Sequence, residues 1–294
     1  MSGSLLLLFV FLSAFLAPPL SRLLRMPVPV GELVIGLLLG HFLAQGVALP
    51  EILGFLADFG FLLLMFLAGL EVDFNLLRQL ERRHFVFYAL YVVGMFLGAG
   101  LLAGLLGVGL AQALILALVS IGLMVATLRD MGILGRAFAK RVLILGVLGE
   151  VASLFGLTAM EKAAHYQGLL SLLKEVGIIA LFFLLLFLAF RLAGLFLWWY
   201  PEVGRRLVYE EDPSAMGIRL SLALMFAAAV MGGLVGLESV LGAFLAGMIL
   251  SYFLQKKHDL EAKLSAMGYG FLIPIFFIRT GMGIDLSGLD GRLL

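Results

Sequence analysis

Residues 142–160 read VLILGVLGEVASLFGLTAM, an apolar run long enough to cross a bilayer as one helix. The only ionisable side chain in this run is Glu150, which lies close to its middle. A charged carboxylate at that depth costs about 2.5–3.5 kcal/mol on insertion scales, unless it faces protein or water. Glu150 is therefore the first candidate for a functional residue.

The composition around this run is that of an all-α polytopic membrane protein. The 294 residues are 63% hydrophobic and 13% charged, whereas a soluble domain is about 45–50% apolar and about 25% charged. The absence of cysteine excludes disulfides and thiolate metal sites from this chain. Neither a phosphate-binding glycine loop nor a basic stretch interleaved with aromatic residues is present, so we expect no nucleotide or nucleic-acid partner.

The hydropathy pattern predicts about ten transmembrane helices. The runs long enough to span about 30 Å fall at residues 4–20, 28–46, 52–70, 85–107, 110–128, 142–160, 176–199, 217–235, 237–254 and 266–284. The first run lacks the basic residues that precede a signal peptide's apolar region, so we interpret it as a spanning helix. Fourteen of the 20 basic residues fall in the odd-numbered connections. The positive-inside rule then places both ends of this chain outside a plasma or inner membrane.

An internal repeat relates two parts of the chain. GELVIG at 31–36 resembles GAFLAG at 242–247, and GLEVD at 69–73 resembles GMGID at 281–285. The first glycines of the paired motifs are 38 residues apart in one copy and 39 in the other. Seven crossings separate the copies, so the predicted repeat is inverted, as in secondary transporters. A second copy of full length would continue past residue 294, so the second repeat is expected to be incomplete.

Four segments resemble the monovalent cation:proton antiporters of the Kef and NapA type. The segments are VPVGELVIGLLLG (28–40), FGFLLLMFLAGLEVD (59–73), LGAFLAGMILS (241–251) and FLIPIFFIRTGMGIDL (271–286). The resemblance implies a homodimer in which a core domain moves against a dimerisation domain. It assigns residues 1–75 and 217–286 to the two halves of the dimerisation domain, 85–160 to a half-core with a candidate broken helix at 110–128, and 176–199 to a linker helix.

Carried over to this chain, the family's ion-binding acid falls on Glu150. The family usually has Asp at this position, after Asn, Asp or Gln, whereas this chain has Glu after Gly149. A Thr-Ser pair usually marks the broken helix, and here the pair is Val119-Ser120. The expected ion site is therefore a degraded version of the family pattern. About three core helices of the family fold are expected to be missing from this chain, and a second polypeptide that supplies them is one of the options.

Other polar residues are weaker candidates for the same site. Ser120 and Thr127 would offer oxygen atoms to Na⁺ or K⁺, or would bond back to their own helix. Arg279, within the last run, needs a counter-charge from Glu150, Asp58 or Glu238, or else reaches towards the outer surface. Glu32 lies about one turn from a cytoplasmic end, which favours a solvated or capping role over ion binding.

Two functional hypotheses remain open. The first is a secondary transporter that exchanges H⁺ for Na⁺ or K⁺ by alternating access at Glu150, with no enzyme activity and no cofactor beyond the transported ions. The second is a non-transporting or partner-dependent membrane protein on the same scaffold, such as a sensor, a regulatory subunit or half of a split transporter. The change at Gly149, the change at Val119 and the expected missing helices favour the second.

Overall fold

The computed structural model describes residues 3–42, 49–72, 82–117, 119–164, 215–234, 238–253 and 258–284, with isolated positions between 177 and 199. All regular structure in the described residues is helical. The expected span at 176–199 and the Asp285 end of the second repeat lie outside the described residues. The fold class is therefore all-α, as the sequence predicts.

Apolar runs form the helices of the first half of the chain. These helices are α1 (Gly3–Leu23), α2 (Val28–Phe42), α3 (Glu51–Leu70), α5 (Arg82–Leu106), α6 (Leu110–Leu116), α7 (Ile121–Asp130) and α8 (Ala137–Ala164). The helices that follow are α11 (Met216–Leu234), α12 (Ser239–Phe253), α13 (His258–Met267), the π-helical turn η1 (Gly268–Leu272) and α14 (Ile273–Met282).

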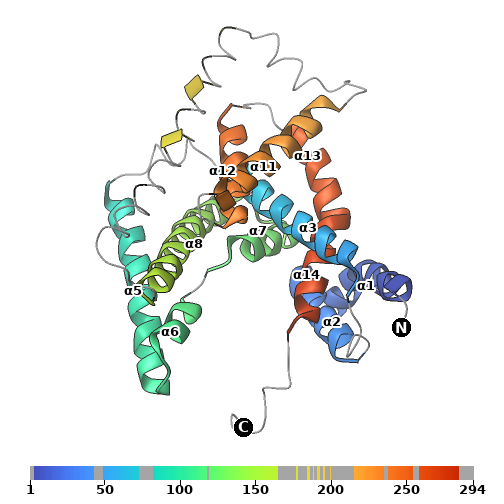
Figure 1. Ribbon diagram of the computed structural model, residues 1–294, viewed down its shortest axis with the longest axis horizontal. Helices are drawn as coiled ribbons and strands as arrows, with labels where there is room; N and C mark the ends of the chain where they lie inside the picture. The colour runs from blue at the N-terminus through green and yellow to red at the C-terminus, as the bar shows by residue number, and fades with distance from the viewer. Residues whose placement is uncertain are drawn as a thin grey trace.

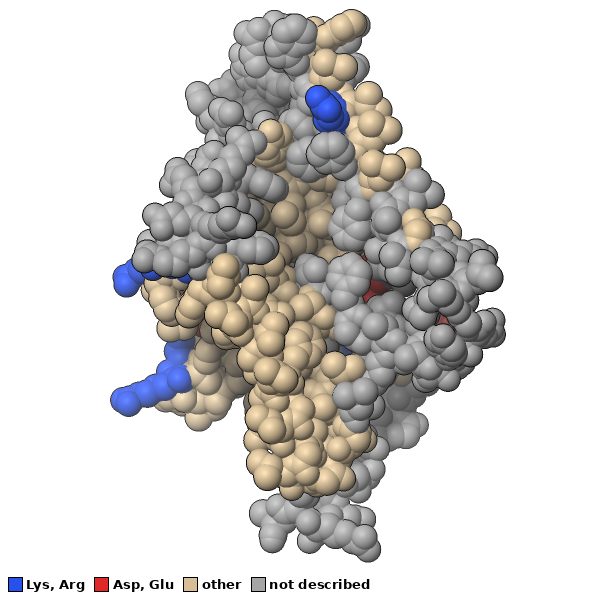
Figure 2. Space-filling view, turned by 90° about the vertical axis from the view of Figure 1, so that its left-hand side faces the viewer, with Lys and Arg blue, Asp and Glu red and all other residues tan. Residues whose placement is uncertain are grey.

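Six helical stretches, one of which includes the interruption between α6 and α7, are long and apolar enough to cross a membrane. They cover residues 3–23, 51–70, 86–106, 112–130, 216–234 and 260–282, and two shorter apolar helices cover 28–42 and 239–252. Many of their large apolar side chains are exposed on the outer surface of α1 and α5. Figure 2 shows one such face, on which the described residues are mostly uncharged and only a few basic side chains project. This surface suits a surrounding bilayer.

The stretch at 110–128, a candidate broken helix from the family resemblance, contains two helices, because α6 ends at Leu116 and α7 begins at Ile121. The structure corrects one expected boundary. The last helical segment begins at His258, eight residues before the expected start at 266, and includes Lys263. It continues through η1 into α14, so polar residues expected in a connection extend the helix instead.

Two helix pairs with matching contacts form the centre of the structure. α2 packs on α14, and α3 packs on α12. A Cβ atom added at Gly36 would overlap the carbonyl oxygen of Ile278, and one at Gly281 would overlap that of Leu33. In the second pair, a Cβ at Gly247 would overlap the Phe66 carbonyl, and one at Gly69 would overlap the Phe244 carbonyl. The lack of side chains at these glycines therefore permits backbone-to-backbone contact in both pairs.

A short helix, α7, links two groups of helices (Figure 1). One group contains α5, α6 and α8, which contact each other, and the other contains α1, α2 and α14. α7 contacts α8 in the first group, α2 in the second, and α3 as well. Residues at the two ends of α7 therefore have different neighbouring helices.

Candidate functional site

The candidate site is built around the break between α6 and α7. α6 is followed by Ala117, whose N–H still bonds back to the carbonyl of Ala113. Ser120 has extended backbone angles, φ −105° and ψ 105°, and precedes the first residue of α7. Each helix end leaves backbone groups without partners inside the helix. The break therefore presents unpaired carbonyl groups of α6 and unpaired N–H groups of α7 to the neighbouring helix α8.

The carboxylate of Glu150 binds the start of α7. Its Oε2 atom accepts a hydrogen bond of 2.7 Å from the backbone N–H of Ile121. Ser120 Oγ accepts a second bond, of 3.4 Å, from the backbone N–H of Leu123. A helix N-terminus carries a partial positive charge, so a negative group is favourable there. Glu150 and Ser120, both predicted from the sequence, are thus brought together at one helix end.

Ser153 satisfies the other side of the break. Its Oγ lies 3.1 Å from the carbonyl oxygen of Ala117 and 2.7 Å from that of Gly149, so the hydroxyl proton is donated to one of them. Ser153 follows Glu150 by three residues and lies on the same face of α8. One face of α8 therefore provides an acceptor for α7 and a donor for α6. Ser153 was not predicted from the sequence, although its spacing of three residues from Glu150 was the available signal.

Close packing of α8 against the break depends on two glycines. A Cβ atom at Gly149 would lie 3.1 Å from Cγ2 of Val119, and one at Gly146 would lie 2.9 Å from Sδ of Met124. Gly149 and Val119 therefore face each other at the break. The two residues form one local packing arrangement, in which the branched side chain of Val119 lies against the space left by the missing side chain of Gly149.

The other candidates lie away from this point. Thr127 is half-buried on α7, six residues from Ile121 and so about 9 Å along the helix. Arg279 is half-buried on α14, and its Nε has no hydrogen-bond partner among the described residues. Asp58 is exposed on α3. In the described part of the chain, no ion pair joins Arg279 to Glu150, Asp58 or Glu238.

Charged residues also gather at the opposite end of α7. Asp130 Oδ2 accepts a hydrogen bond of 3.0 Å from the backbone N–H of Val28, at the start of α2. Arg129 lies 3.8 Å from a carboxylate oxygen of Glu71, and its guanidinium carbon lies 4.7 Å from the ring centre of Tyr269. These contacts hold the second end of α7 against α2, α3 and η1.

Comparison with known families gives one match over nearly the whole chain. Residues 11–293 match the family described as "Sodium/hydrogen exchanger, transmembrane". The match includes both helix pairs, the break between α6 and α7, and Glu150.

Several curated proteins resemble the chain at low identity. A putative Na⁺/H⁺ antiporter of Bacillus subtilis is 27% identical over 95% of this chain and 47% of its own length. A probable Na⁺/H⁺ antiporter of Bacillus cereus is 28% identical over 98% of the chain and 75% of its own length. A Na⁺/H⁺-K⁺ antiporter of the same organism is 27% identical over 97% of the chain and 72% of its own length. The chain thus spans between about half and three quarters of the length of these relatives.

Proposed function

The chain belongs to the sodium/hydrogen exchanger family, and from this premise we propose that it exchanges protons for Na⁺ or K⁺ across the membrane. The observation that carries the proposal is the contact between the Glu150 carboxylate and the Ile121 N–H at the broken helix. The relatives are described as antiporters of Na⁺ and H⁺, and one of them also of K⁺. The proposed substrates of this chain therefore include both Na⁺ and K⁺.

Glu150 binds the proton and the cation in turn. An ionised carboxylate has more acceptor sites than the single hydrogen bond to Ile121 occupies, so it has capacity for a cation ligand. Protonation removes the negative charge that favours the start of α7. Ser120, at the start of α7, supplies a further oxygen atom, whereas Thr127 lies about 9 Å further along the same helix. Loading Glu150 with either ion therefore changes the electrostatics at the junction between α7 and α8, within the half-core that is expected to move against the dimerisation domain.

The membrane arrangement is an inverted repeat with about ten crossings and both ends of this chain outside. The paired contacts support this repeat. Adding 211 to Leu33 and Gly36 gives Phe244 and Gly247, and adding 212 to Phe66 and Gly69 gives Ile278 and Gly281. The close contacts of Gly36 and Gly281 between α2 and α14 therefore have counterparts at Gly247 and Gly69 between α3 and α12. A two-fold axis that exchanges the copies requires this correspondence.

A homodimer is part of the proposal. Helices α1 to α3 and α11 to α14 would supply the dimerisation domain, with 85–160 as the half-core. The exposed apolar side chains of α1 support a contact with lipid or with a second copy. Cross-linking of single cysteines introduced on α1 distinguishes the two, because the chain has no cysteine of its own.

Proton flux in proteoliposomes tests the function. The 294-residue chain is reconstituted, Na⁺ or K⁺ gradients are imposed separately, and a pH-sensitive dye reports the lumen. We expect cation-driven flux that Glu150→Gln abolishes and that Glu51→Gln, at an exposed acid at the start of α3, leaves unchanged. Absence of flux with both ions from folded protein contradicts stand-alone antiport. It favours the alternative, in which Glu150 serves only as a cap for α7 in a non-transporting or partner-dependent protein.

A further inference from the structure

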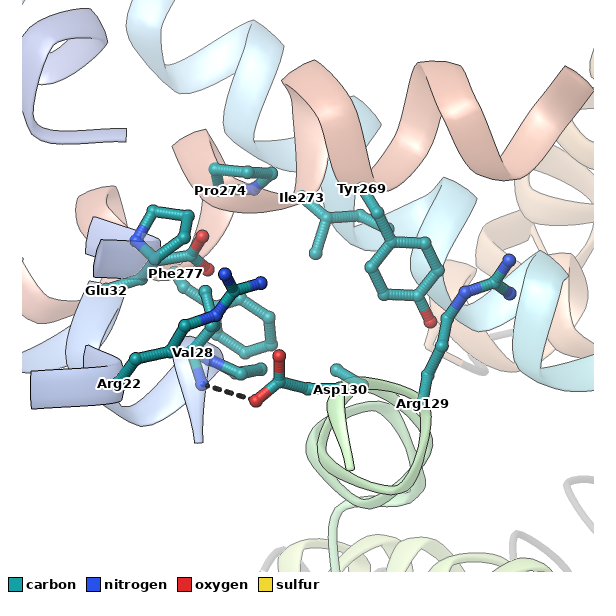
Figure 3. A pocket seen from close by; sticks show the side chains of 12 residues that line it. Arg22, Val28, Glu32, Arg129, Asp130, Tyr269, Ile273, Pro274 and Phe277 are labelled. Carbon is teal, nitrogen blue, oxygen red and sulfur yellow. Dashed lines mark hydrogen bonds between the residues drawn. The ribbon is translucent and has the colours of Figure 1, made fainter. Parts of the chain in front are cut away.

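A cavity of about 280 Å³ lies at the opposite end of α7 from Glu150. Its walls come from α1, α2, α7, η1 and α14 (Figure 3). Ile121 and Asp130, the first and last residues of α7, are nine residues apart, or about 13 Å along the helix axis. The cavity therefore lies between α7 and the group that contains α1, α2 and α14, one short helix away from the candidate site. The volume accommodates a small cation with part of its hydration shell, since one water takes about 30 Å³ in the liquid.

Two of the charged side chains that line the cavity already have partners. Asp130 accepts the hydrogen bond from the Val28 N–H at the start of α2, where the helix end favours a negative group. Arg129 faces Glu71 at 3.8 Å and the ring of Tyr269 at 4.7 Å. Their charges are therefore largely balanced by groups of the protein itself.

The carboxylate of Glu32 lines the same cavity and is only 4% exposed. Within the described residues, no hydrogen bond or ion pair to Glu32 is formed, and its charged neighbours in the cavity are Asp130, Arg129 and the exposed Arg22. The sequence favoured a solvated or capping role for Glu32. Because the side chain is buried, the structure does not support the solvated role. A buried carboxylate without a protein partner has a high free energy when ionised, unless a cation is bound or a proton is taken up.

We propose that Glu32 and this cavity form a second site for a monovalent inorganic cation, separate from the site at Glu150. The choice of a monovalent cation rests on the proposed antiport, while the site itself rests on the buried, unpartnered Glu32 and the cavity that it faces. A single carboxylate, with the other acid engaged at a helix end and two arginines nearby, offers little to a divalent ion, which prefers several carboxylates. The cation would occupy this site on the side of α7 that carries Arg129 and Asp130.

Labelling of one introduced cysteine tests the site without requiring transport. Val28 lines the cavity, is half-buried, and lies one helical turn before Glu32 on the same face of α2. The chain has no other cysteine, so Val28→Cys reports this position alone. Rates of reaction with a cationic and an anionic methanethiosulfonate reagent of similar size are compared in liposomes. Ala126→Cys, on the α7 wall, provides a second reporter if Val28→Cys fails to fold.

We expect the cationic reagent to react faster than the anionic one, and the ratio of rates to fall severalfold with Glu32→Gln. Glu32→Asp, which keeps the charge, should preserve the ratio, and Glu51→Gln, outside the cavity, should not change it. Replacing choline by Na⁺ or K⁺ at constant ionic strength should slow the cationic reagent only when Glu32 is present. A faster anionic reagent, a ratio unchanged by Glu32→Gln, or no reaction with either reagent overturns the proposal.

Flux measurements separate this proposal from the proposed function. Glu32→Gln should raise the cation concentration needed for half-maximal flux severalfold and retain flux at saturating cation, whereas Glu150→Gln should abolish flux at every concentration. An unchanged half-maximal concentration overturns the second site and leaves antiport intact. If the native chain shows no flux, antiport fails, and the labelling ratio still decides whether Glu32 attracts cations.

Discussion

Oε2 of Glu150 lies 2.7 Å from the backbone nitrogen of Ile121, so a carboxylate of α8 caps the first turn of α7. The two residues are 29 positions apart in the chain. The contact gives Glu150 a structural role in addition to the proposed ion-binding role. The two roles have different chemical requirements, because a cap needs only an acceptor oxygen whereas cation binding needs a negative charge.

Substitutions at Glu150 should separate the two roles. Glu150→Gln retains an acceptor oxygen for the Ile121 N–H and loses only the charge effect at the helix end, about 0.3–1 kcal/mol. Glu150→Leu loses the cap as well, which costs about 0.5–2 kcal/mol. We expect both variants to lose flux and only Glu150→Leu to lose much thermal stability in detergent. Equal stability of the two variants would show that the hydrogen bond to Ile121 contributes little.

Ser153→Ala should weaken the junction between α6 and α8. The substitution leaves the carbonyl of Ala117 without the hydroxyl donor, and an unsatisfied buried acceptor costs about 1–3 kcal/mol. Ser221→Ala is the matched control, because Ser221 is also buried but its hydroxyl donates only to the carbonyl four residues before it, Gly217. Thermal unfolding should therefore shift for Ser153→Ala and much less for Ser221→Ala. Similar shifts of the unfolding temperature for the two variants would show that the effect of Ser153→Ala comes from the lost bond to Gly149 in its own helix.

Gly69→Ala should separate α3 from α12. An added Cβ would overlap the carbonyl oxygen of Phe244, which is backbone and cannot rotate away, and overpacking of this kind costs about 1–3 kcal/mol. Gly54→Ala, in the same helix, meets no atom within 4 Å and should be neutral or stabilising by up to about 1 kcal/mol. The midpoint of thermal unfolding in detergent measures both. A tolerated Gly69→Ala would contradict the close packing of this helix pair.

The packing between Gly149 and Val119 predicts non-additive substitutions. Gly149→Asn places a side chain where a Cβ would already lie 3.1 Å from Cγ2 of Val119, so this variant alone should be destabilised. Val119→Thr alone replaces a methyl group by a hydroxyl and should cost less. If the two positions are coupled, the double variant should be more stable than the sum of the single effects predicts, by about 0.5–3 kcal/mol. Strict additivity of the three measurements would exclude the coupling.

Local hydropathy and residue type were sufficient for much of the fold. The apolar runs at 52–70 and 217–235 correspond closely to α3 and α11, because a helix must satisfy its own backbone in lipid. The break within 110–128 was expected only from the family resemblance, since neither Pro nor a polar cluster interrupts the run and the unpaired groups are satisfied by α8. The start of the last segment was missed, because α13 is a polar helix that hydropathy does not report.

Composition and short-range patterns along the chain were enough to predict a helical membrane protein, an acid at Glu150 within an apolar run, and glycines at matched spacing. The contacts of Glu150 with Ile121 and of Ser153 with Ala117, and the burial of Glu32 beside a cavity, emerged only from the folded structure. Such contacts join residues of different helices, and their geometry follows from how closely the glycine faces allow those helices to approach.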